Sequence, residues 1–232
     1  MKRSFLWCLA ALTVSPLTPR AQTVQQLVEK VKAKIDQVKD YTATGRMKTN
    51  VSFLKVPVAN VVIYFRKPDQ LKIKNEKGIS FVPRGAVSIN LNNVLSNGAY
   101  TVLDAGKDKV NGIAVQVVKL LPVDDNAEVV LSTLYIDEAR LVILKSRTTT
   151  RDNGSYELEM SYGNYVNYGL PDKILFSFNT KEYKLPKGIT FDFDDGAPPP
   201  KETAGGKGKK GRAEISIRSY TINKGLSGDV FK

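Results

Sequence analysis

The sequence predicts a mainly β protein of the α+β class, in which an antiparallel sheet covers a single amphipathic helix. The stretch from Thr23 to Asp40 is the only long one that repeats apolar residues at three- and four-residue steps. Most of the chain after Tyr41 alternates apolar and polar residues between turn signals, which is typical of hairpin strands. The apolar face of the helix needs a partner surface, and a sheet is the simplest one.

The predicted helix has a defined beginning and one apolar face. Thr23 and Gln26 have the spacing of a capping box, in which two side chains satisfy free backbone groups at the helix start. A period of about 3.6 residues places the aliphatic side chains of this segment on one stripe. The stripe consists of Val24, Leu27, Val28, Val31, Ile35 and Val38.

The first 21 residues have the build of a secretory signal peptide. Lys2 and Arg3 precede an apolar run over residues 5–14, and the small residue Ala21 follows two prolines. We expect cleavage after Ala21, which leaves residues 22–232 as a single exported domain. The apolar run is too short to span a bilayer, and no later run approaches about 20 apolar residues.

The residue types present argue against most enzyme chemistry. The chain has no histidine, and its one cysteine, Cys8, lies inside the predicted signal peptide. Zinc sites, Cys–His pairs and Ser–His–Asp triads are therefore excluded. The carboxylate clusters at 124–125 and 192–195 have the sequence of turns, not of two groups held across a cleft. We expect a protein that is not an enzyme and uses no cofactor or metal.

The chain is basic. Its formal net charge is +12, and loss of Lys2, Arg3 and Arg20 with the signal peptide leaves +9, which favours anionic membrane surfaces or acidic partners. Residues 196–212 contain three consecutive prolines and then a run of glycine and lysine with little to bury. We expect a flexible basic loop there, either merely solvated or in contact with a membrane. The glycine run lacks the ending of a phosphate-binding loop.

Several predicted strands carry apolar side chains on one face, and these are the candidate binding residues. Every second residue is apolar from 59 to 65, and the same alternation returns after Pro68 and on two later strands. A packed core and a ligand cavity would produce the same pattern, so both interpretations stay open. The candidates are Val61, Ile63, Phe65, Leu71, Ile73, Phe81, Leu158, Met160, Phe176 and Phe178.

One segment, residues 64–73, resembles the LolA family of periplasmic lipoprotein carriers and the wider group of outer-membrane lipoprotein-sorting proteins. Its sequence is Tyr-Phe-Arg-Lys-Pro-Asp-Gln-Leu-Lys-Ile. In that family a strand ends in a basic residue and a proline, and an apolar residue of the next strand comes three places after the proline. The order of signal peptide, one helix and antiparallel strands is also similar, as is the ending at residues 223–231.

The resemblance implies a strongly curved antiparallel sheet, an unclosed half-barrel, which covers the N-terminal helix and encloses a hydrophobic cavity. It implies a soluble, monomeric periplasmic carrier that binds acyl chains of lipoproteins or other lipids for delivery to the outer membrane. An inner-membrane ABC transporter would be the donor and an outer-membrane protein the acceptor, without nucleic acid. Lys67 takes the position of the functional arginine, which implies a gating or partner-binding role, and Leu71 that of a cavity aromatic.

The alternative function belongs to a different class. A β domain with a filled core would serve as a non-enzymatic interaction or structural module of the envelope. Bound acyl chains would favour the carrier, and their absence would favour the module.

Overall fold

The computed structural model describes residues 23–50, 58–68, 70–75, 99–152, 154–179 and 210–231. Three sequence-based predictions lie outside these residues: the signal peptide at 1–21, the candidate Phe81, and residues 196–209 of the basic loop. The predicted loop extends too far at its end, because a strand begins at Lys210. Residues 210–212 continue the alternation of that strand, and backbone pairing with its neighbour extends to them.

The described residues form one ten-stranded sheet in which all neighbouring strands are antiparallel. The strand order is β3-β2-β1-β10-β9-β8-β7-β6-β5-β4, so β3 and β4 are the edges of an open sheet. The strands are β1 (Asp40–Asn50), β2 (Ala59–Arg66), β3 (Gln70–Asn75), β4 (Tyr100–Val110), β5 (Ile113–Pro122), β6 (Val129–Asp137), β7 (Val142–Thr150), β8 (Gly154–Ser161), β9 (Lys173–Asn179) and β10 (Lys210–Ile222). The predicted mainly β, antiparallel fold is confirmed.

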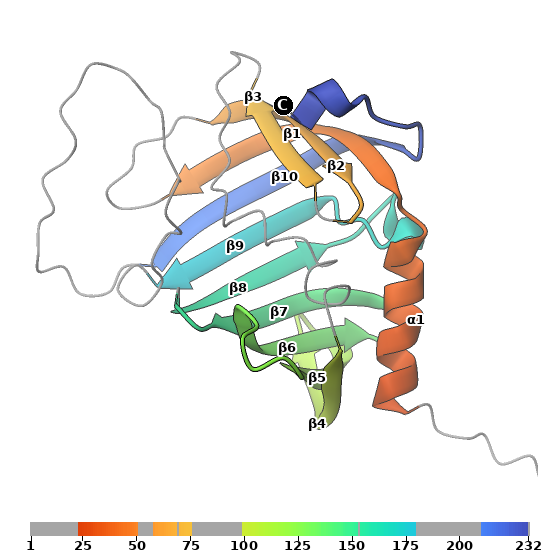
Figure 1. The fold of residues 1–232 in the computed structure, drawn as a ribbon, viewed down its shortest axis with the longest axis vertical. Helices are drawn as coiled ribbons and strands as arrows, with labels where there is room; N and C mark the ends of the chain where they lie inside the picture. The colour runs from red at the N-terminus through yellow and green to blue at the C-terminus, as the bar shows by residue number, and fades with distance from the viewer. Residues whose placement is uncertain are drawn as a thin grey trace, which may run out of the picture.

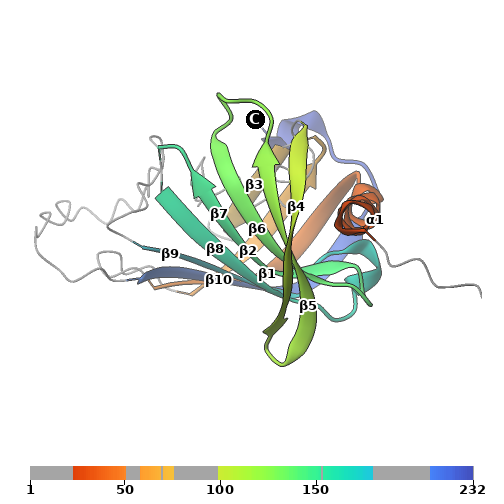
Figure 2. The ribbon, with the colours of Figure 1, turned by 90° about the horizontal axis from the view of Figure 1, so that it is seen from below.

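The sheet is strongly curved. In Figure 2, β9 and β10 run nearly horizontally at the lower left, whereas the edge strand β4 of the same sheet runs nearly vertically. The strands follow the chain order from β4 to β9, but the last strand, β10, inserts between β1 and β9. This insertion places the last strand, β10, beside the first strand, β1, as Figure 1 shows.

The helix, α1 (Val24–Asp36), begins as predicted and ends earlier than predicted. Thr23 Oγ1 accepts a hydrogen bond from the Gln26 amide N–H, and the Gln26 side chain accepts one from the Thr23 N–H, each at 3.2 Å. Leu27, Val28 and Val31 of the apolar stripe are buried. The prediction of a helix as far as Asp40 is wrong, because β1 begins at Asp40 and pairs from there with β2.

One face of the sheet packs against α1, and we call it the inner face. On this face, Leu27, Val28 and Val31 belong to one hydrophobic core with side chains from β5 to β9. A second core lies over β1, β2, β3 and β10, where its buried members are Ala43, Val61, Ile63, Ile73 and Ile215. We call these two regions the helix half and the hairpin half of the inner face. Figure 1 shows α1 beside the ends of the strands of the helix half.

Candidate functional site

All the described candidate residues lie on the inner face. Strand register places Ile63 opposite Ile73, and Phe65 opposite Leu71, in the hairpin half. It places Leu158 opposite Phe176 in the helix half. Of the nine candidates that the structure describes, all except the half-buried Leu71 are buried: Val61, Ile63, Phe65, Ile73, Leu158, Met160, Phe176 and Phe178. The alternation in the sequence therefore predicted which side chains share this face.

Aromatic rings are concentrated in both halves. In the hairpin half, the Phe65 ring lies 5.1 Å from that of Tyr41, and the Tyr41 ring lies 5.2 Å from that of Tyr220. In the helix half, the Phe176 ring lies 5.3 Å from that of Phe178 and 5.6 Å from that of Tyr156, centroid to centroid. Such rings offer large apolar surfaces at both ends of the inner face.

Small residues on β10 separate the two aromatic groups. Gly211 pairs with Phe178, and Ala213 pairs with Phe176. A Cβ atom on Gly211 would lie 2.3 Å from Cζ of Phe178, so the Phe178 ring lies across this glycine. Sequence reasoning missed Gly211 because it assigned the residue to the basic loop. The alternation of Gly211, Ala213, Ile215 and Ile217 was the signal that could have found it.

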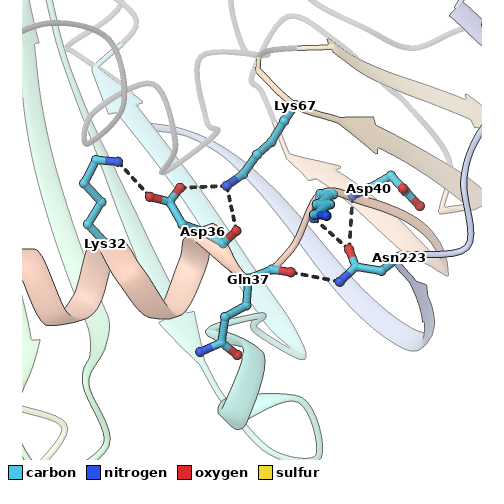
Figure 3. Close-up of polar contacts among 7 residues, drawn as sticks. Lys32, Asp36, Gln37, Asp40, Lys67 and Asn223 are labelled. Atoms are coloured by element: carbon cyan, nitrogen blue, oxygen red, sulfur yellow. Dashed lines mark hydrogen bonds and ion pairs between the residues drawn. The ribbon is translucent and has the colours of Figure 1, made fainter.

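Lys67 connects the β2–β3 turn to the C-terminal end of α1. Its Nζ donates hydrogen bonds to the backbone oxygen of Asp36 at 2.9 Å and to Oδ1 of the same residue at 2.7 Å (Figure 3). Oδ2 of Asp36 accepts a further bond from Lys32 at 2.7 Å. A cation at the end of a helix also interacts favourably with the helix dipole. We call the contact between Lys67 and Asp36 the latch.

The latch is partly exposed, and it favours the ionised form of Asp36. The side chains of Lys67 and Asp36 are 29% and 35% exposed. Burial raises the pKa of Asp36, but hydrogen bonds from Lys32 and Lys67 outweigh this effect and hold the pKa below its ordinary value of 3.8. The carboxylate is therefore charged at neutral pH, as an ion pair with Lys67 requires.

Asn223 forms a second connection at the same end of the helix. Its side chain accepts a hydrogen bond from the Lys39 N–H at 2.7 Å and donates one to the Gln37 backbone oxygen at 2.8 Å (Figure 3). Asn223 adopts a φ of 55°, a left-handed conformation that asparagine tolerates better than most residues. Asn223, the residue after β10, is thus hydrogen-bonded to the segment that connects α1 to β1.

The C-terminal residues pack against β2 and β3. The guanidinium of Arg66 lies 4.9 Å from the centre of the Phe231 ring and donates a hydrogen bond to the Leu226 backbone oxygen at 3.1 Å. The short helix η3 (Gly228–Phe231) contacts β3, near the chain end marked in Figure 1. The turn that carries Lys67 is therefore flanked by the end of the chain.

The described part of the chain contains no group of three or more His, Cys, Asp and Glu side chains placed to hold a metal ion. Within the same residues, no helix has the length and apolar character needed to cross a membrane. The inner face is therefore broadly apolar, and an ion pair, the latch, lies at the C-terminal end of α1.

No family model and no curated protein matches the sequence. Solved structures do match the fold. A domain described as an outer membrane lipoprotein-sorting protein, from Vibrio parahaemolyticus, is similar with a TM-score of 0.56 at 13% sequence identity. This match covers 89% of the present chain and 94% of the Vibrio chain.

Two further structures give the same result. A LolA superfamily protein from Nitrosomonas europaea matches with a TM-score of 0.54 at 10% identity, covering 91% of this chain and 98% of that one. A DUF1329 family protein from Desulfovibrio piger matches with a TM-score of 0.53 at 12% identity, covering 90% and 97%. The chain therefore has a LolA-like fold, and the resemblance found at residues 64–73 is confirmed at the level of the fold.

Proposed function

We propose that this protein is a periplasmic carrier that binds acyl chains of lipoproteins or other lipids on the inner face of its sheet, beneath α1. The observation that carries the proposal is that the apolar residues of β2 and β3 and those of β8 and β9 form two hydrophobic cores on the same face of one sheet. The LolA-like fold supports the same function. The protein is not an enzyme in this proposal, and it acts as a monomer after removal of residues 1–21.

The physical need for such a carrier follows from the hydrophobic effect. Each methylene group that leaves water for an apolar site gains about 0.8 kcal/mol, so a free acyl chain cannot cross an aqueous compartment at a useful concentration. The sequence contains no phosphate-binding loop for ATP. Loading and release therefore depend on partners, for which we propose an ABC transporter as donor and an outer-membrane protein as acceptor.

In this proposal, the binding site opens when the latch between Lys67 and Asp36 breaks. Lys67 and Asp36 are the side chains that join the β2–β3 turn to the end of α1 by an ion pair. Partly exposed ion pairs contribute about 1 kcal/mol or less, so breaking the latch costs little. An acyl chain could then displace part of the apolar stripe of α1 from the sheet. The apolar contacts between helix and sheet would be replaced by apolar contacts between acyl chain and sheet. Lys67 is in this way the proposed gating residue.

A photo-crosslinking experiment tests where the ligand lies. The purified protein is equilibrated with a long-chain acyl methyl ester that carries a diazirine, irradiated, digested and mapped by mass spectrometry. We expect adducts on inward residues such as Met160 and Phe176. The neighbouring outward residues Glu157 and Glu159 are the matched internal control, because they share the strand with Leu158 and Met160. Adducts confined to outward residues would contradict the proposed site.

A filled β domain is the second candidate function, and one observation favours it. The candidate residues on the inner face are buried by the protein itself, as in an ordinary core. Organic extraction of the purified protein followed by mass spectrometry separates the two. Acyl chains in a ratio near one per protein support the carrier, whereas their absence together with no uptake of a fluorescent acyl probe supports the module.

A further inference from the structure

Hydroxyl groups cross the inner face in the middle of the helix half. Strand register aligns Ser132, Thr148 and Tyr156 on β6, β7 and β8. The Ser132 and Thr148 hydroxyl oxygens lie 3.2 Å apart and share a hydrogen bond, and Thr148 also bonds to Tyr156. Burial raises the pKa of Tyr156, so its hydroxyl is neutral. This row of hydroxyls is therefore internally satisfied and uncharged.

Ser146 lies one row further along β7, and its situation differs. Its side chain is 1% exposed, and among the described residues its Oγ is the buried side-chain polar atom that has no hydrogen-bond partner. Leaving a buried hydroxyl unpaired destabilises a protein, so native structures rarely contain such groups without a reason. A bound ligand that carries a hydrogen-bond acceptor would give this hydroxyl a partner.

The surroundings of Ser146 restrict what that acceptor is. Register places Ser146 between Leu134 on β6 and Leu158 on β8, and both belong to the core that contains α1. Among the described residues no Lys or Arg is buried, so no cation is enclosed beside Ser146 in this core. An ionised carboxylate buried there would lack a counterion, which is very unfavourable. A neutral carbonyl would need only the one donor that Ser146 provides.

We infer that Ser146 Oγ donates a hydrogen bond to the neutral carbonyl of an ester- or amide-linked acyl chain bound on the inner face. The inference rests on the proposed function and refines it, because it names the chemical class of the ligand. Leu134, Leu158 and Phe176 accommodate the hydrocarbon on either side, and Ser146 fixes the carbonyl along the chain. The site thereby selects esterified or amide-linked acyl chains over free fatty acids.

Two fluorescent probes and two variants test the inference. The probes are a pyrene-labelled alkyl chain that ends in a methyl ester and a hydrocarbon of the same length without the ester. Serine-to-alanine substitution at Ser146 removes the donor, and Ser177→Ala is the matched control. Ser177 lies on β9 between Glu157 and Arg212, on the opposite face of the sheet.

We expect the wild type and Ser177→Ala to bind the ester about five-fold more tightly than the hydrocarbon, the effect of one net hydrogen bond. Ser146→Ala should lose this preference while its affinity for the hydrocarbon is unchanged. If wild type binds both probes equally, or if Ser146→Ala keeps the preference, the inference is wrong and the proposed function stands. If wild type binds neither probe, the proposed function fails and the inference fails with it.

Urea unfolding of the unliganded protein gives an independent readout. Ser146→Ala removes an unpaired buried hydroxyl, so the urea concentration at the midpoint of unfolding should rise relative to wild type. A lower midpoint would show that the hydroxyl already has a partner in the free protein and would overturn the inference.

Discussion

The two halves of the inner face are held in different ways. In the helix half, Leu27, Val28 and Val31 of α1 are buried against the sheet. In the hairpin half, the turn after β2 reaches the same helix through Lys67 and its bonds to Asp36. Burial of one aliphatic side chain stabilises by about 1.5–3 kcal/mol, whereas a partly exposed ion pair contributes about 1 kcal/mol or less.

This difference predicts where the proposed carrier would open. Lifting the whole helix from the sheet would expose several aliphatic side chains at once. The bonds from Lys67 to this end of the helix and to Lys39, by contrast, are polar. Water can replace polar contacts at small cost, and it cannot replace apolar ones. In the proposed carrier, we therefore expect a ligand to enter at the end of α1 near Lys67.

The largest effect expected from this comparison concerns core truncation. Leu134→Ala in the helix half should lower the free energy of unfolding by about 3–4 kcal/mol, because the side chain is 0% exposed and leaves a cavity. Ile73→Ala, on the edge strand of the hairpin half and 8% exposed, should cost about 2 kcal/mol. Urea unfolding measures both values. Equal costs would mean that the two halves are equally well packed.

The second effect concerns the polar connection at Asn223. Asn223→Ala removes the bonds to Lys39 and Gln37 and places alanine at a φ of 55°, so we expect a loss of about 2 kcal/mol. Asn111→Ala is the matched control, since Asn111 has a φ of 51° in the turn between β4 and β5. A loss no larger than that of the control would show that the side-chain bonds of Asn223 contribute nothing.

The third effect is kinetic and concerns the latch. Lys67→Met removes the charge and keeps the length of the side chain, so it should lower stability by about 1 kcal/mol or less. The rate of acyl-probe uptake should rise by up to about five-fold, as measured by stopped-flow fluorescence. Lys72→Met, on the neighbouring strand β3, is the control and should leave the rate unchanged. An unaltered rate in Lys67→Met would argue against gating by this residue.

The smallest effect is the pH dependence of the latch. The folded-state pKa of Asp36 lies below its ordinary value of 3.8, so the unfolded chain binds this proton more readily than the folded chain does. The contribution of the latch is therefore complete above about pH 4 and is lost as the pH falls through the lower, folded-state pKa. The difference in uptake rate between wild type and Lys67→Met should shrink accordingly in acid. A difference that stays constant while Asp36 of the folded protein becomes protonated would contradict this origin.

Local patterns in the sequence predicted the parts of the site that depend on periodicity. The capping box at Thr23 located the start of α1, and strict alternation placed Val61, Ile63, Phe176 and Phe178 on one face. The contacts that hold the site together could not be predicted in this way. Asp36 and Lys67 are 31 positions apart and Gln37 and Asn223 are 186 apart, and no local period relates them.

The sequence by itself determined that one amphipathic helix and a set of alternating strands must share an apolar interior, because side-chain direction follows directly from backbone period. Only the tertiary structure decided that β10 lies between β1 and β9, that the helix ends at Asp36, and that Ser146 is buried without a partner. These features arise from strand pairing and packing between distant residues. The free energies of these contacts depend on which surfaces pack together. The same order of helix and strands along the sequence is compatible with many different packing arrangements.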